Sequence, residues 1–99
     1  MTRRVRWGEK AALDYHEQLE FIANDSPANA ELVDNRIIAA VELLAKRPIG
    51  RAGRVAGTYE KSIAGTSLIV AYMLKDETLH IVRIIHMKRQ WQKGEWPEE

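Results

Sequence analysis

The chain has no cysteine, few prolines and no long apolar run. Without cysteine it can form no disulfide, hold no metal through thiolates and use no thiol nucleophile, which fits a reducing compartment. No apolar stretch approaches the roughly 20 residues that a membrane-spanning helix needs. The first seven residues are basic but are not followed by the apolar segment of a secretory signal. We therefore predict a cytoplasmic protein.

A strong charge of one sign is also missing, because the net charge is only +1. The overall field is therefore not that of a dedicated nucleic-acid binder. The distribution is uneven, since residues 9–34 hold seven acidic residues against Lys10, whereas residues 46–61 hold five cations against Glu60. Residues 80–93 hold four cations and no acid. This pattern indicates either a basic binding surface or charges that only solubilise opposite faces.

Common catalytic and cofactor motifs are absent as well. The three histidines, His16, His80 and His86, lie far apart and form no metal-site spacing. Gly50, Gly53 and the following Gly57 precede a strand-like segment rather than a helix, so they do not form a phosphate-binding P-loop. We expect no metal and no cofactor.

Two amphipathic helices are predicted in the first half. From Glu9 to about Asn24, apolar residues recur every three or four positions, opposite a polar face that includes Asp14. Ser26 is a good N-cap and Pro27 suits the first position of a second helix, which we expect to end near Lys46, before Pro48. Its apolar stripe is Ala30, Val33, Ile37, Val41 and Leu44, widened by Leu32, Ile38 and Ala40. The two helices are predicted to form an antiparallel hairpin.

Strands are predicted at both ends of this hairpin. Residues 3–7 alternate as a short first strand, and three runs rich in Ile, Val and Tyr follow at 59–63, 68–74 and 79–85, separated by short turns. Early helices and late strands indicate an α+β fold, with the hairpin packed on one face of a sheet. A length of 99 residues suits one domain. We predict a mobile tail from about residue 93.

The last strand runs directly into a cationic cluster of His86, Lys88 and Arg89. These side chains can bind phosphate, and on RNA they can stabilise the charge that develops when a 2′-OH attacks the adjacent phosphate. The alternative is that His86 binds a neighbouring backbone group while the two cations are solvated. The basic segment around Arg51 and Arg54 can meet this cluster on one surface.

Arg83 interrupts an apolar strand, so it needs a partner or an exposed face. It either pairs with Glu60 or lines a binding surface. Trp91 lies beyond the strand and is predicted to pack or to anchor a partner.

The order of these features resembles the RelE/ParE superfamily of bacterial toxins from type II toxin–antitoxin modules. Residues 47–60, RPIGRAGRVAGTYE, are similar to the family stretch P-x-x-G-R-x-x-G-T-R-E, and residues 84–91, IIHMKRQW, are similar to V-L-H-x-x-R-x-W. The start, from Val5 to Asp14, is also similar. The resemblance spans roughly residues 3–91 and implies a helical hairpin on a curved, mainly antiparallel sheet.

Within the superfamily the chain resembles the ParE branch. The position that best matches an arginine of RelE-like ribonucleases falls on or near Ile69, and Tyr59 stands where the family commonly has arginine. The resemblance to ParE implies a protein that binds DNA gyrase rather than an enzyme. The residues expected to bind the target are Arg51, Arg54, Lys61, Arg83, His86, Lys88, Arg89 and Trp91.

The resemblance also implies an acidic, partly disordered antitoxin that wraps the hairpin and sheet. Tyr15, Leu19, Val41 and Leu44 are candidate antitoxin contacts, with the alternative that each belongs to the core. Two other functions stay open at this point. One is a ribosome-dependent mRNA endoribonuclease with His86, Lys88 and Arg89 at its site. The other is an inactive relative that serves as an antitoxin-binding module, which Tyr59 keeps open.

Overall fold

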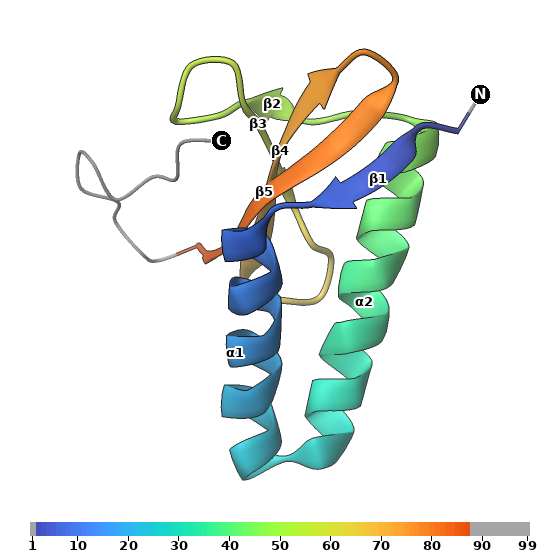
Figure 1. Ribbon diagram of the computed structural model, residues 1–99. Coiled ribbons are helices and arrows are strands. Elements are labelled where there is room, and N and C mark those ends of the chain that lie inside the picture. Colours follow the sequence, from blue (N-terminus) through green and yellow to red (C-terminus); the bar gives the residue numbers. More distant parts are fainter. Residues whose placement is uncertain (1, 88–99) are drawn as a thin grey trace.

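The computed structural model describes residues 2–87 and has an α+β architecture, as predicted (Figure 1). Two helices, α1 (Glu9–Asp25) and α2 (Pro27–Lys46), follow the first strand, β1 (Arg4–Trp7). The later strands are β2 (Arg51–Ala52), β3 (Tyr59–Ser62), β4 (Leu68–Lys75) and β5 (Thr78–His86). The tail predicted from residue 93 lies outside the described residues.

The helices run side by side in opposite directions, and the link between them lies at the end farthest from β1 (Figure 1). Ser26 serves both helices. Its backbone N–H donates to the carbonyl of Ile22 at 2.8 Å, and its side chain accepts from the backbone N–H of Asn29 at 3.2 Å. Pro27 takes the first position of α2, where its missing N–H leaves no hydrogen bond unmade. The predicted helix boundary is confirmed.

The predicted width of the α2 stripe was partly wrong. Ala40 packs against the core, but Leu32 and Ile38 are 49% and 44% exposed. The apolar stripe that a surface helix buries covers only about a third of its circumference. In α2 this stripe is centred on Ile37, Val41 and Leu44, which belong to the core. The two flanking residues therefore lie beyond the contact.

The sheet has the order β1-β5-β4-β3-β2. Strands β3, β4 and β5 form the two predicted antiparallel hairpins, and β1 pairs with β5 in parallel. Sequence patterns did not predict β2, because two residues carry no periodicity. It forms by pairing antiparallel with β3, with Arg51 opposite Glu60.

The two faces of the sheet differ in what they contact. Trp7, Ile81 and Tyr72 are partners across β1, β5 and β4, and all three belong to the core under the helices. We call the opposite side the outer face. The cross-strand pair Ile69 and Ile85 lies there and is also buried, which explains the continuous apolar run in β4. Within residues 2–87, neither helix is long and apolar enough to cross a membrane.

Candidate functional site

One arginine from each of the two basic segments lies in the same row across the sheet. Successive partners in the register are Arg51 on β2, Glu60 on β3, Ala71 on β4 and Arg83 on β5. Partners in adjacent strands project from the same face, so these four side chains form one row. Arg51 lies directly beside Glu60, and the small side chain of Ala71 separates Glu60 from Arg83. Arg51 and Arg83 thus share one row of the sheet but lie three strands apart, at opposite ends of that row.

Glu60 organises the basic segment before β3. Its carboxylate is 4% exposed and accepts a forked pair of hydrogen bonds from Arg54, from Nε at 2.9 Å and from Nη2 at 3.1 Å. The backbone N–H of Arg54 donates to the same carboxylate at 2.9 Å. Burial alone would raise the pKa of Glu60, but the hydrogen bonds from Arg54 and the charges of Arg54 and Arg51 outweigh it and lower this pKa. The bonds to Glu60 therefore hold the Arg54 side chain in place and stabilise the loop between β2 and β3.

Arg83 pairs with Asp14 of α1, not with Glu60. Its Nε donates to Asp14 Oδ2 at 2.6 Å and its Nη2 donates to Asp14 Oδ1 at 2.9 Å, with both side chains only 12% exposed. Asp14 Oδ2 also accepts from the backbone N–H of Ile84 at 3.1 Å. The pairing suggested with Glu60 was wrong because Arg54 already fills both of its oxygens.

The Asp14 contact compensates for the short first strand. Strand β1 ends at Trp7, opposite Ile81, and the chain then turns into α1. Among residues 2–87, the edge of β5 beyond Ile81 therefore has no strand beside it on that side. The Asp14 carboxylate accepts the hydrogen bond that a strand carbonyl would otherwise accept from Ile84. We placed Asp14 on the polar face of the helix, and sequence reasoning missed this role. The lone arginine in an apolar strand is the signal that a carboxylate is needed nearby.

Tyr59, which departs from the family pattern, is a packing residue in this structure. Its ring stacks on that of Tyr72, with ring centroids 5.6 Å apart and an interplanar angle of 26°. Tyr72 is fully buried, and burial raises the pKa of its hydroxyl, with Tyr59 adding to the effect. Within residues 2–87, the Tyr72 hydroxyl is a buried polar side-chain group without a hydrogen-bond partner. A Cβ on Gly50 would lie 2.6 Å from that hydroxyl, so only glycine fits there without a shift.

The remaining predicted residues fall in three places. Lys61 pairs with Val70, a core residue under the helices, and so lies on the opposite face from Arg51 and Arg83. His86 ends β5 opposite Leu68 and is half-buried. Lys88, Arg89 and Trp91 lie outside the described residues.

The four candidate antitoxin contacts also divide. Val41 and Leu44 are 6% and 1% exposed and belong to the core, although Leu44 also lines a groove between α2 and β3. Tyr15 and Leu19 are half-buried and pack against the same core. Tyr15 also donates a hydrogen bond to Asp34 of α2, and burial together with this bond raises the pKa of Tyr15 to about 12. For Val41 and Leu44 the core alternative holds.

The arrangement favours recognition over proton transfer. Arg54 and Arg83 each donate to a carboxylate in a forked pair, which holds each positive charge at a defined place on the sheet. Within residues 2–87 no three His, Asp or Glu side chains gather as a possible metal site.

Comparison with known proteins identifies the family. Residues 5–91 match the family model described as "ParE toxin of type II toxin-antitoxin system, parDE". The chain belongs to this ParE toxin family. It is also 33% identical to "Putative toxin Y4kP" of Sinorhizobium fredii over 90 residues, which cover 90% of this chain and 93% of that protein.

Solved structures share the fold of this ParE-family toxin. A chain of the chromosomal ParDE toxin–antitoxin system from P. aeruginosa aligns with a TM-score of 0.79 at 20% identity, covering 88% of this chain and 98% of that one. A chain of the toxin–antitoxin complex RelBE2 from Mycobacterium tuberculosis aligns with a TM-score of 0.62 at 24% identity, covering 87% and 99%. The α+β fold implied by the resemblance is confirmed.

Proposed function

We propose that this ParE-family toxin inhibits growth by binding DNA gyrase and that a cognate antitoxin neutralises it. The family match over residues 5–91 carries the proposal. The geometry of the outer face supports a binding protein, because Arg54 and Arg83 are oriented by carboxylates rather than placed beside a nucleophile and a base.

The target surface in this proposal is the outer-face row together with the end of β5. Arg51 is exposed, and it opposes Glu60, whose carboxylate is held by Arg54. Arg51 is therefore the described cation best placed to contact a partner. Arg83 lies in the same row on β5, three strands away, whereas His86, opposite the core residue Leu68, projects from the helix face at the end of β5. Lys88, Arg89 and Trp91, which are outside the described residues, are also proposed to contact the target.

The antitoxin in this proposal docks on the other side of the sheet. A groove of about 340 Å³ lies between α2 and β3, lined on the helix by Arg36, Ala39, Ala40, Leu43 and Leu44 and on the strand side by Lys61, Ser62 and Ala64. Its lining is mainly apolar, and Leu43 is 46% exposed. Arg36 and Lys61 place a cation on each wall. Such a groove suits the apolar face of an acidic amphipathic segment. Lys61, expected to bind the target, fits this antitoxin surface better.

A supercoiling assay with purified gyrase tests the target. We expect the toxin to inhibit supercoiling and to trap cleaved DNA, and we expect the antitoxin to reverse both effects. Arg51→Ala should weaken inhibition about tenfold, because an interface arginine that contributes to binding is worth 1 kcal/mol or more. Lys10→Ala, an exposed cation on α1, is the matched control and should leave inhibition unchanged.

Folded toxin that still stops growth but leaves gyrase active would overturn the gyrase proposal. Ribosome-dependent cleavage of mRNA that is lost in His86→Ala would then identify the toxin as a ribonuclease. Full stability with no growth inhibition would instead identify an antitoxin-binding module.

A titration with the cognate antitoxin tests the groove. Ala39→Glu adds a carboxylate to the groove wall while keeping a strong helix-forming residue. We expect the Kd for the antitoxin to rise at least tenfold while toxicity is retained. Asn35→Glu makes the same charge change at an exposed site of α2 outside the groove lining and should bind normally. Equal affinity of both variants would place the antitoxin elsewhere.

A further inference from the structure

A second basic group, of two arginines, one lysine and one histidine, lies on the outer face at the other end of the sheet, where none of the target or antitoxin residues falls. We call Arg4, Arg6, Lys75 and His80 the β1 cluster. The register aligns Arg6, His80 and Met73 across β1, β5 and β4, and it aligns Arg4, Thr78 and Lys75 in the next row. Strands are about 4.8 Å apart and the two rows are about 6.7 Å apart, so the four side chains share one compact surface.

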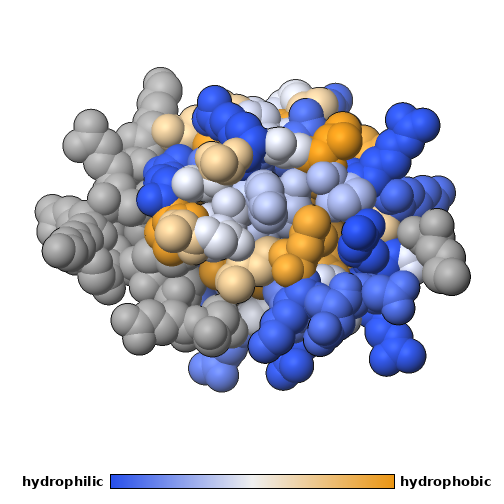
Figure 2. Space-filling model, turned by 90° about the horizontal axis from the view of Figure 1, so that it is seen from above, coloured by the Kyte–Doolittle hydropathy of each residue, from blue (hydrophilic) through white to orange (hydrophobic). Residues whose placement is uncertain are grey.

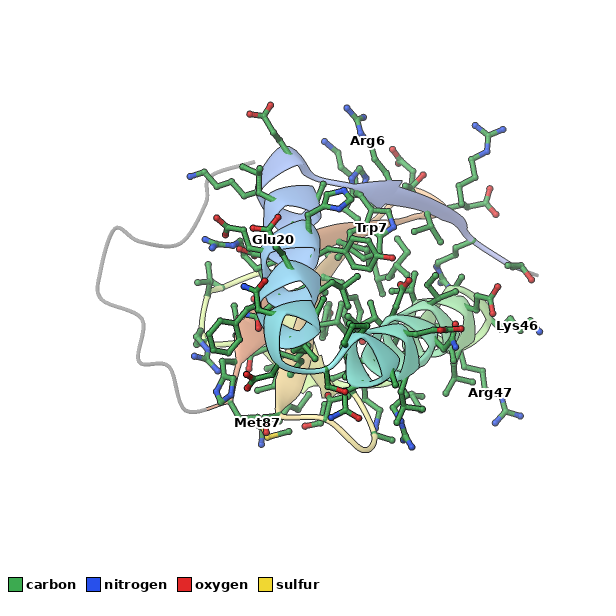
Figure 3. The ribbon with its side chains drawn as sticks, turned by 90° about the horizontal axis from the view of Figure 1, so that it is seen from below. Arg6, Trp7, Glu20, Lys46, Arg47 and Met87 are labelled. Carbon is green, nitrogen blue, oxygen red and sulfur yellow. The ribbon has the colours of Figure 1, made fainter. Side chains whose placement is uncertain are left out.

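Strand alternation forces these residues onto the outer face. Trp7 turns toward the helices, where its ring lies 5.4 Å from that of Tyr15, and Arg6 extends away from them (Figure 3). Because the apolar residues of β1 and β5 are needed in the core, the polar residues between them must point outward. Figure 2 looks onto the molecule from above and shows hydrophilic side chains on several sides of a paler, partly apolar centre.

The surface at the β1 cluster is hollowed. A groove of about 250 Å³ is lined by Arg6, Gly8, Met73, Lys75, His80, Ile81 and Val82, which include no acidic residue. A neighbouring hollow of about 450 Å³ extends past Arg4 and includes Asp76 of the β4–β5 turn. Since Asp76 would repel an anion, the groove beside Arg6, His80 and Lys75 is the favoured position for negative charge.

We propose that the β1 cluster binds the phosphate backbone of a nucleic acid. The Arg6 guanidinium and the Lys75 ammonium line the groove, and Arg4 lines the adjoining hollow, so together they provide the forked and point-charge donors that phosphate accepts. The apolar floor at Met73 can contact a sugar or a base edge. This site is distinct from the gyrase surface and the antitoxin groove, and its test does not depend on either.

An acidic peptide fits this surface less well. A peptide that pairs with the open edge of β1 would direct alternate side chains to opposite faces of the sheet, so only every second carboxylate would reach the cluster. A nucleic-acid strand carries a charge on every nucleotide, and it can lie across the two rows without pairing with the strand edge.

Fluorescence anisotropy with the purified full chain and a labelled 20-base-pair DNA duplex tests the proposal, with the salt concentration varied. Counterion release makes each phosphate contact worth a factor of roughly 5 at 0.15 M salt. The double variant Arg4→Gln/Arg6→Gln should therefore bind about 20-fold more weakly, and the slope of log K against log salt should fall by nearly two. Lys75→Gln alone should lower the slope by about one.

The matched control is Lys46→Gln/Arg47→Gln, which removes the same charge from exposed positions at the end of α2 (Figure 3). It should bind within twofold of the unmodified chain. Equal losses in the two double variants would show bulk attraction and overturn the site, as would no binding by the unmodified chain. Competition by a polyglutamate peptide as effective as that by unlabelled DNA would assign the cluster to an acidic protein instead. Thermal unfolding of each variant verifies that these exposed substitutions leave the fold intact.

Discussion

Helix α1 and the β2–β3 edge each depend on a forked arginine–carboxylate pair, but the two pairs differ in what they join. Asp14 and Arg83 are 69 residues apart, and their pair fastens a helix to the sheet. Arg54 and Glu60 are six residues apart, and their pair closes a loop beside a two-residue strand. The same chemistry therefore stabilises the whole domain in one place and shapes a local surface in the other.

Helix α1 is held from two sides by adjacent residues. Asp14 reaches β5, while Tyr15 reaches Asp34 on α2 and packs against Trp7. The β2–β3 edge has no comparable long-range polar contact to the helices among the described residues, and it relies on Glu60, on the Tyr59–Tyr72 stack and on the close approach at Gly50. Loss of a contact of α1 should consequently cost more than loss of a contact at the edge.

The largest effect is expected from Asp14→Asn. The change removes the charge that neutralises the nearly buried Arg83 guanidinium, and we expect the free energy of unfolding to fall by about 3 kcal/mol. Chemical denaturation measures it. Glu17→Gln, an exposed site on the same helix, should change stability by less than about 0.5 kcal/mol. A loss below about 1 kcal/mol in Asp14→Asn would show that the pair does not fasten the helix.

Gly50→Ala tests the tight packing at the edge. The new Cβ would lie 2.6 Å from the Tyr72 hydroxyl and 2.9 Å from the Glu60 carbonyl oxygen, so we expect a loss of about 2 kcal/mol. Removing the hydroxyl in Tyr72→Phe should be neutral or stabilising on its own, because that group is buried without a partner. The loss from Gly50→Ala should be smaller in the Tyr72→Phe background, and an unchanged loss would place the clash at Glu60 alone.

Tyr15→Phe removes the bond between the helices and should lower the free energy of unfolding by about 1.5 kcal/mol at neutral pH. Because the folded state raises the pKa of Tyr15 from 10.0 to about 12, this stabilisation is complete below pH 10 and is lost as the pH rises toward 12. Denaturation curves between these pH values should therefore converge for the variant and the unmodified chain. Parallel curves would mean that the hydroxyl does not carry the effect.

The smallest effect is expected from Glu60→Gln, at about 1 kcal/mol, because Arg54 remains 32% exposed and solvent screens it. The folded state lowers the pKa of Glu60, so its contribution is complete above the ordinary value of 4.5 and is lost as the pH falls through the lower folded pKa. The difference between Glu60→Gln and the unmodified chain should accordingly shrink on acidification. A constant difference would assign the effect to shape rather than charge.

Regular elements were predictable because their signals are local. The apolar spacing of α1, the Ser26-Pro27 boundary and the three late strands follow from residues that are close in sequence, and the structure confirms them. Strand β2 was not predictable, because two residues become a strand only when β3 is beside them.

The sequence indicated the basic segments of the candidate site, but not which carboxylate each arginine pairs with. The basic segments around Arg51 and Arg83 were identifiable from charge alone, and their family resemblance is confirmed. Which carboxylate pairs with which arginine was not predictable, because Asp14 lies in a helix, 69 residues before its partner Arg83. Likewise, the apolar character of Val41 does not by itself tell core from contact surface.

The sequence by itself determined the helices, the principal strands, the α+β class and the presence of basic segments, because periodicity, capping and charge act over a few neighbouring residues. Only the tertiary structure decided which cations are paired and which face each one occupies. Asp14 is next to Arg83 because β1 ends early and leaves an open edge that α1 covers, and Arg6 joins His80 and Lys75 because parallel pairing sets their register. Such contacts form between segments that are distant in sequence. Their positions are set when folding buries the apolar face of the sheet against the helices.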